Sequence, residues 1–433
     1  MQTIYSNQRK STDLIYKKDP KNPNLSLLSC SILLLNSCFG IEQFFFDGMY
    51  QNGFILQLFF LLFAFAINII SFILLTKCWI YGQSFSFMTL WENSISSYFS
   101  WIPNLCIVLC YYQYTFSYYT NAVIVIQDIV YYFSDFNDPS PSILANQFFI
   151  VYVFIAIPSL FICCAKEVHN FLILSWIKLF CLISIIGIHI YNFVGVIKEP
   201  EFSISENLQI PVSGVFDRIS SNFIYTVGLC GNQPVVEHII QVMKKPTLGR
   251  ISNVYIISTV IGMALILFIS ILSTLMYGRM TYTVSMFDFY DQSKKSTIAA
   301  KILYLGFLLT TLFLWQWIEA RHFSQIFSGS WELSKWMNVF WVPNVLSCFI
   351  IVIANAAGTF SPYLATIIFD IIGIVSIVSI CLILSPIFFI KLFGLDKSKK
   401  MWIGVSIFLI ILGMFYIVFT IYIDSKEIAN SYF

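Results

Sequence analysis

Charged residues are scarce along this chain. Asp, Glu, Lys and Arg make up 11% of its 433 residues, against about 25% in soluble globular proteins. The net charge is +2, and no basic block interleaved with aromatic residues occurs. This composition excludes a soluble globular domain and argues against nucleic acid as a partner.

Metal-binding and catalytic motifs are also missing. The chain has 4 His and 11 Cys, but no CxxC and no Cys/His cluster with the spacing of a zinc site. The cysteines, for example Cys106 and Cys110, lie in apolar runs and are expected to be buried free thiols. No nucleophile/His constellation is visible, so the sequence predicts neither an enzyme nor a resident cofactor.

The N-terminal segment lacks the apolar core of a signal peptide. Residues 1–25 are polar and carry five cations, so we expect a disordered cytosolic tail. We expect residues 26–424 to form one transmembrane domain and residues 425–433 a short extracytoplasmic tail.

Long apolar runs fill the rest of the chain. Hydrophobic residues reach 58% and the mean hydropathy is +0.80. A membrane-spanning helix needs about 17–25 mostly apolar residues, and eleven segments qualify. They are 26–48, 53–79, 99–133, 147–165, 170–197, 217–241, 251–277, 298–325, 337–358, 361–391 and 400–423. The runs are continuous and do not alternate, which predicts an all-α integral membrane protein and not a β-barrel.

The distribution of positive charge favours a cytosolic N-terminus. An odd number of spans places the two termini on opposite sides of the membrane. With the N-terminus inside, sixteen of the 24 Lys and Arg residues fall on the cytosolic side. Lys178 then lies near the inner end of the fifth span, with no role assigned to it.

Two of the spans are interrupted by polar residues and glycine. The first contains "NSCFGIEQ" (36–43), and the sixth contains "TVGLCGNQP" (226–234). Unpaired backbone groups cost several kcal/mol each in hydrocarbon, so a broken helix must be packed in protein or line a cavity. Taken alone, such a residue is more often a close-packing contact or an interhelical hydrogen bond than part of a ligand site.

The two interruptions lie five spans apart, as in a five-plus-five inverted repeat with broken helices 1 and 6. The N–H groups at the start of a half-helix attract a carboxylate, and the C=O groups at its end attract an ammonium group or sodium. A zwitterionic amino acid is complementary to both ends.

The order of motifs resembles the amino acid/auxin permease family, which includes sodium-coupled neutral and vesicular amino acid transporters. The resemblance covers nearly all of residues 25 to 424. In the first five spans the matching residues are Asn36, Gly40, Ile41, Asp128, Pro158, Leu160, Lys166, Leu172 and Ser175. In the later spans they are Cys230, Gly231, Asn232, Val235, Glu237, Thr310, Thr311, Arg321, Pro362, Gly373 and Pro386.

Three positions depart from the family pattern. Phe46 and Asp47 stand where the family has a first-span proline, Asn232 replaces a histidine, and Glu319 replaces a proline. These departures concern the substrate and the coupling ion more than the fold.

The resemblance implies a leucine-transporter-like fold and a substrate site between the two broken helices. The residues expected to bind substrate are Ser37, Cys38, Phe39, Gly40, Tyr225, Gly228, Gly231 and Asn232. Asn36 matches a family position that joins a sodium site, with Thr310 and Thr311 supplying hydroxyl oxygens. A plain hydrogen bond between Asn36 and a threonine is the competing interpretation.

Acidic residues within the spans are candidates for proton binding or gating. These are Glu42, Glu237 and Glu319, and Asp370 is a further possible proton site. For Glu237 we favour a structural pair with Lys244 or Lys245 over a gate. Proton coupling is therefore the alternative to sodium coupling.

We expect a monomeric multi-pass protein of the plasma membrane or of an endolysosomal or vacuolar membrane. Its expected function is secondary active transport of amino acids, first of all neutral ones, by alternating access. Spans 1, 2, 6 and 7 would rock against spans 3, 4, 8 and 9. The alternatives are a non-transporting amino acid sensor or degenerate paralogue, and a structural subunit of a large membrane complex.

Overall fold

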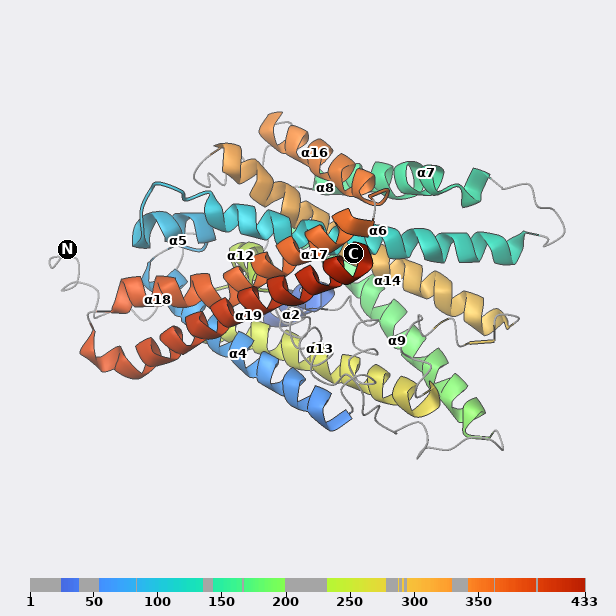
Figure 1. Ribbon diagram of the computed structural model, residues 1–433, viewed down its shortest axis with the longest axis horizontal. Helices are drawn as coiled ribbons and strands as arrows, with labels where there is room; N and C mark the ends of the chain where they lie inside the picture. Colours follow the sequence, from blue (N-terminus) through green and yellow to red (C-terminus); the bar gives the residue numbers. More distant parts are fainter. Residues whose placement is uncertain are drawn as a thin grey trace.

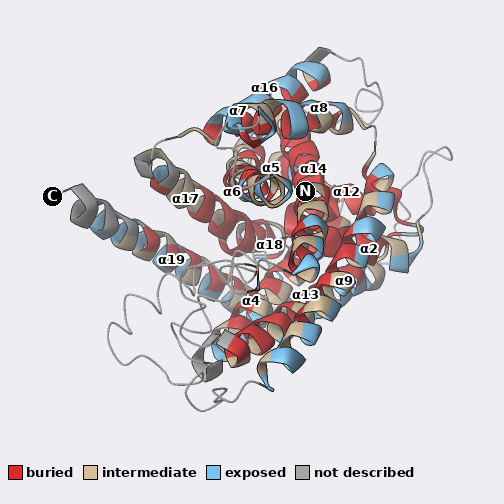
Figure 2. Cartoon of the chain, turned by 90° about the vertical axis from the view of Figure 1, so that its right-hand side faces the viewer, coloured by how far each residue is buried: buried red, intermediate tan, exposed pale blue. Residues whose placement is uncertain are grey.

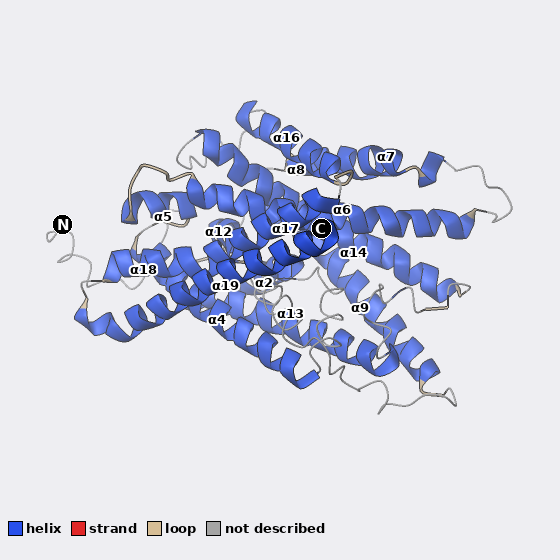
Figure 3. Ribbon diagram, viewed as in Figure 1, coloured by secondary structure: helices blue, strands red, loops and turns tan. Residues whose placement is uncertain are grey.

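The computed structural model describes residues 25–38, 54–82, 84–134, 143–165, 167–198, 232–277, 287, 290–291, 294–328, 342–361, 363–394 and 396–432. Within these ranges the ordered elements are helices (Figure 3), and the β-type pairing is limited to an isolated bridge between Leu25 and Met243.

Helices lie in each of the eleven predicted spans. The first five contain α2 (Leu27–Cys38), α4 (Phe54–Tyr81), α6 (Ile102–Phe133), the series α7 (Gln147–Phe149), η2 (Ile150–Ala156) and α8 (Ile157–Cys163), and α9 (Leu172–Val196). The last six contain α12 (Gln233–Val242), α13 (Leu248–Tyr277), α14 (Lys295–Ser328), α16 (Val342–Gly358), the series α17 (Tyr363–Val378), η6 (Ser379–Leu384) and α18 (Ser385–Phe393), and α19 (Lys400–Tyr432). Shorter elements are α5 (Phe87–Ser94), η1 (Ile143–Ala145), η3 (Val168–Phe171) and η7 (Lys397–Lys399).

Six of the described helical segments are long and apolar enough to cross a membrane by length and composition. They are Leu58–Tyr81, Val168–Val196, Leu248–Met276, Lys295–Phe327, Ile367–Phe393 and Lys400–Ile423. Shorter apolar helices are Leu27–Ser37, Gln147–Cys163 and Pro343–Gly358. The more polar α6 buries Asn104, Gln113 and Thr115, which is stable at membrane depth where neighbouring helices satisfy the polar groups.

Helix α14 is the central element. It packs against α6, α9, α16, α8 and α2 (Figure 1). In the most apolar stretch of α14, 67% of the residues are buried inside the protein, against 28% in the corresponding stretch of α19. Buried residues accordingly concentrate along α14 and its neighbours, while the outward faces of α9 and α19 are exposed (Figure 2). These outward faces are apolar, as expected for contact with lipid.

The fourth and tenth spans both contain a π-helical turn. The turns η2 and η6 are each followed, two residues later, by a proline, Pro158 or Pro386. Proline has no N–H group and its ring clashes with the carbonyl of the preceding turn, so a wider turn accommodates it. In η6 the carbonyl of Cys381 accepts a hydrogen bond from the hydroxyl of Ser71 on α4.

Helices α2 and α12 are the described parts of the two interrupted spans. The start of α2 meets the end of α12, where the amide of Leu25 donates to Val242 at 2.9 Å and the amide of Lys244 donates to Leu25 at 3.0 Å. The described part of α2 extends to Cys38, and α12 begins at Gln233, with Pro234 in its first turn. The start of α12 lies within the second predicted interruption, and the central residues of both interruptions lie outside the described ranges.

Candidate functional site

Lys178 lies at the junction of α9, α2 and α14. Its ammonium nitrogen Nζ donates to the backbone carbonyl of Asn36 at 2.6 Å and to the hydroxyl of Thr311. The ring of Phe307, one turn before Thr311, has its centroid 4.3 Å from Nζ. Lys178 is 2% exposed, so it is a buried cation held by groups on two other helices.

Two of the three predicted sodium ligands meet at this ammonium group. The hydroxyl of Thr310 instead donates to the carbonyl of Phe307 at 2.9 Å, within α14. The side-chain amide of Asn36 donates to Ser175 at 3.1 Å, so Asn36 contributes its main-chain oxygen. The oxygens of Asn36 and Thr311 thus suit a cation, and in this structure both accept from Lys178.

The start of α12 is connected to α4 and α18. The side-chain nitrogen of Gln233 donates to the hydroxyl of Ser71 at 3.3 Å, and its oxygen accepts from the hydroxyl of Ser385 at 3.1 Å. Asn232, predicted to bind substrate, is buried beside it at 7% exposure. These contacts fix where the half-helix begins, next to the π-helical turn η6.

Glu237 has a different partner from the one considered above. Its Oε2 accepts a hydrogen bond from the backbone amide of Phe87 at 3.1 Å, at the first residue of α5. The N-cap residue Ser86 makes no side-chain cap of its own. A carboxylate at a helix N-terminus is stabilised by the exposed amides and the helix dipole. Pairing with Lys244 or Lys245 is therefore wrong for the described structure.

Two buried histidines join α12 to α14. The Nε2 atoms of His238 and His322 lie 3.3 Å apart, and Nδ1 of His322 lies 3.1 Å from Oδ1 of Asn104 on α6. The amide of Asn104 donates to Gln325 at 2.8 Å, which leaves its oxygen to accept from His322. The sequence did not indicate this pair, because the two histidines are 84 residues apart.

Glu319 lies on α14 between α6 and α16. Its Oε2 lies 2.9 Å from the side-chain amide of Asn355 and 3.2 Å from the hydroxyl of Thr115. Glu319, Thr115 and Asn355 are all fully buried. The residue that replaces the family's proline is thus part of an interhelical polar cluster.

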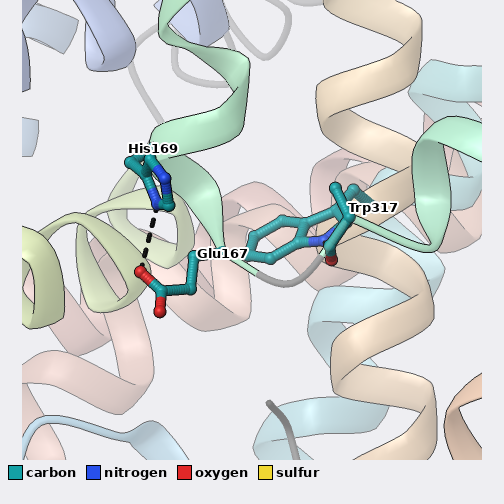
Figure 4. Close-up of polar contacts among 4 residues, drawn as sticks. Glu167, His169 and Trp317 are labelled. Carbon is teal, nitrogen blue, oxygen red and sulfur yellow. Dashed lines mark hydrogen bonds and ion pairs between the residues drawn. The ribbon is translucent and has the colours of Figure 1, made fainter. Parts of the chain in front are cut away.

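Two side chains attach α14 to the end of α8. Nε1 of Trp317 and Nη2 of Arg321 both donate to the carbonyl of Ala165, at 2.8 and 2.6 Å. Figure 4 shows Trp317 beside the segment that carries Glu167 and His169, whose side chains lie 3.1 Å apart. Because the last carbonyls of a helix lack intrahelical partners, these donors stabilise the end of α8.

Several predicted site residues lie outside the described ranges. Helix α2 includes Ser37, whose hydroxyl donates to Leu34 at 2.8 Å, and the backbone of Cys38. The predicted site residues outside the described ranges are Phe39, Gly40, Glu42, Tyr225, Gly228 and Gly231.

Lys178 is the main residue that sequence reasoning overlooked. Its sequence signal is a lysine inside the apolar run 170–197, where an ionisable residue is expensive and indicates a function by default. The positive-inside rule placed Lys178 near the inner end of its span, so it was not considered as a functional residue.

No family model matches the sequence, and no curated protein matches it either. Among solved structures, MhsT in complex with L-phenylalanine is similar over 93% of this chain and 100% of that chain, with 13% identity and a TM-score of 0.56. A manganese transporter of Eremococcus coleocola, in complex with an aromatic bis-isothiourea compound, is similar over 94% of this chain and 89% of that chain, with 13% identity and a TM-score of 0.53. These likenesses confirm the predicted fold class: the chain has the leucine-transporter-like fold of an all-α membrane protein.

Proposed function

We propose that this protein is a secondary active transporter of amino acids that works by alternating access and is driven by a proton gradient. The observation that carries the proposal is the buried ammonium of Lys178 between α2 and α14. The described part of α2 reaches the first predicted interruption, and α14 belongs to the part of the fold packed around α6. A cation that joins these two parts is placed where binding can be linked to movement.

An amino acid is the substrate that best matches the two interrupted spans. The start of α12 offers N–H groups to a carboxylate, and the sequence predicts a half-helix end in the first span whose C=O groups attract an ammonium group. MhsT, which shares the fold at 13% identity, was solved with L-phenylalanine, which supports the substrate class without defining its side chain. The proposed binding residues are those predicted from the sequence in spans 1 and 6.

The contacts of Lys178 favour a proton over sodium as the coupling ion. A protonated lysine supplies the positive charge that the Asn36 carbonyl and the Thr311 hydroxyl stabilise. Loss of its proton removes that charge and weakens the attraction that joins α2 to α14. Sodium, bound near Asn36, Thr310 and Thr311, is the second candidate, and it would require Lys178 to move from these oxygens.

Uptake into proteoliposomes tests the proposal. Purified protein would be given a panel of labelled amino acids while sodium and pH gradients are imposed separately. We expect uphill uptake with a pH gradient in the absence of sodium. Uptake that follows only the sodium gradient would show that sodium, and not the proton, is the coupling ion.

The two alternatives have separate outcomes in the same preparation. An amino acid sensor would bind a labelled amino acid without accumulating it. A structural subunit would bind none and would co-purify stably with partner chains.

A further inference from the structure

The cluster of Thr115, Glu319 and Asn355 has more acceptors than protons. The hydroxyl of Thr115 has one proton to donate. Four acceptor oxygens surround it: the carbonyls of Tyr111 and Tyr112 at 2.8 and 3.1 Å, Oδ1 of Asn355 at 2.6 Å, and Oε2 of Glu319 at 3.2 Å. If the hydroxyl donates to Asn355, its oxygen faces the Tyr111 carbonyl at 2.8 Å with no proton between them.

Turning the Asn355 amide by half a rotation resolves this conflict. The amide nitrogen then donates to Thr115 across the 2.6 Å contact, and Thr115 donates to Tyr111. The amide oxygen of Asn355 now faces Oε2 of Glu319 at 2.9 Å. Two oxygens at that distance attract each other only if one carries a proton, and only Glu319 can supply it.

The charges around Glu319 lead to the same result. Among the described residues it has no ion-pair partner, and Arg321 on the same helix donates to the end of α8. Glu319 interacts electrostatically with Cys110, Tyr112 and Tyr119 of α6 and with Cys163 of α8, none of which is a cation. An ionised carboxylate buried without a positive partner costs several kcal/mol or more, whereas the neutral acid avoids this cost.

We propose that Glu319 is a proton-binding site of the transport cycle. In the conformation described here it is a carboxylic acid whose Oε2–H donates to the amide oxygen of Asn355. The proton leaves to water as the carboxylate forms in another conformation of the cycle, and it is taken up again when the cluster closes. This inference rests on the proposed proton-driven transport and assigns a second proton site, separate from Lys178.

Infrared difference spectroscopy tests the protonation without any transport. The carbonyl stretch of a protonated carboxylic acid should be present in the native protein at neutral pH, shift in D2O and be lost in Glu319→Gln. Glutamine has nearly the same shape as the neutral acid, so we expect the variant to fold. The control Asp128→Asn removes a carboxylate that pairs with Lys301 at 2.9 Å and should leave the band unchanged.

A second variant keeps the test decisive if Glu319→Gln does not fold. Asn355→Ala retains the acid but removes its acceptor, so the band should move to higher frequency instead of disappearing. A native spectrum in which neither variant changes a protonated-carboxyl band would overturn the proposal, whether or not the protein transports amino acids.

Transport measurements then test the role in the cycle. One pH unit supports about tenfold accumulation for one proton per substrate, and Glu319→Gln should reduce that accumulation to equilibrium while retaining exchange of labelled for unlabelled substrate. Full pH-driven accumulation in the variant would exclude Glu319 as a coupling site. If the native protein bound no amino acid, that result would instead contradict the proposed function.

Discussion

Two faces of α14 stabilise buried ionisable groups in different ways. On one face, Thr311 helps hold the ammonium of Lys178 together with the Asn36 carbonyl. Eight residues later, about 12 Å along the helix, Glu319 is surrounded by neutral groups on α6 and α16. The ammonium of Lys178 has acceptors oriented toward it, whereas Glu319, in the arrangement proposed above, faces an amide oxygen and is neutralised by a proton.

The two sites also differ in what they connect. Lys178 joins α2, which belongs to a span with a predicted interruption, to α14, while Glu319 lies among three helices whose spans have no such predicted interruption. We therefore expect substitutions at Lys178 to affect the conformational cycle most strongly. Four substitutions test this difference, in order of decreasing effect.

Lys178→Met should abolish gradient-driven uptake. The substitution keeps most of the side-chain volume, but it leaves the Asn36 carbonyl and the Thr311 hydroxyl without their donor, at about 1–3 kcal/mol for each unsatisfied group. Uptake against pH and thermal unfolding would be measured together. Retained pH-driven uptake in a folded variant would contradict the role of Lys178.

Thr311→Val should weaken pH-driven uptake without abolishing it. The variant keeps the shape and removes one acceptor of Lys178, which is worth about 1–3 kcal/mol for a buried charged group. Thr310→Val is the matched control, because that hydroxyl bonds within its own helix. If the two substitutions reduced the uptake rate equally, the contact between Thr311 and Lys178 would have no specific role in transport.

Asn36→Ala should cost about 1 kcal/mol of stability through the lost hydrogen bond to Ser175. The contact to Lys178 uses the main-chain oxygen, so the substitution should leave the response to sodium unchanged. Uptake would be compared with and without sodium. A sodium response that is present in the native protein and lost in the variant would restore Asn36 as a sodium ligand.

Thr115→Val should have the smallest effect on transport. It removes one hydroxyl from the Glu319 cluster, while Asn355 remains in contact with the acid. We expect a loss of about 1 kcal/mol in unfolding free energy and unchanged pH-driven accumulation. Loss of accumulation here would mean that the proton site needs the complete cluster.

The fold was largely predictable, because the features that indicate it are local. Most spans appear as a continuous apolar run, and the start of α12 lies within the polar interruption at 226–234. The π-helical turns were not predicted, although Pro158 and Pro386 were noted. These prolines indicate where the helical hydrogen bonding is disturbed, but the turn that accommodates each of them depends on packing against neighbouring helices.

The site was only partly predictable. The sequence singled out Asn36, Thr311, Glu237 and Glu319, yet none of the partners found for them follows from spacing along the chain. Glu237 bonds an amide 150 residues away, and His238 meets a histidine that belongs to another span. Spacing predicts partners within a helix, and these partners lie on different helices.

The sequence alone determined that this is a helical membrane protein with two interrupted spans, because hydropathy and helix breaking depend on neighbouring residues. Only the tertiary structure decided which groups surround each buried charge. Lys178 meets Asn36 across 142 residues and Thr311 across 133, and Glu319 meets Thr115 across 204. The energy of a buried ionisable group depends on these distant contacts, so its chemistry is set when the helices pack.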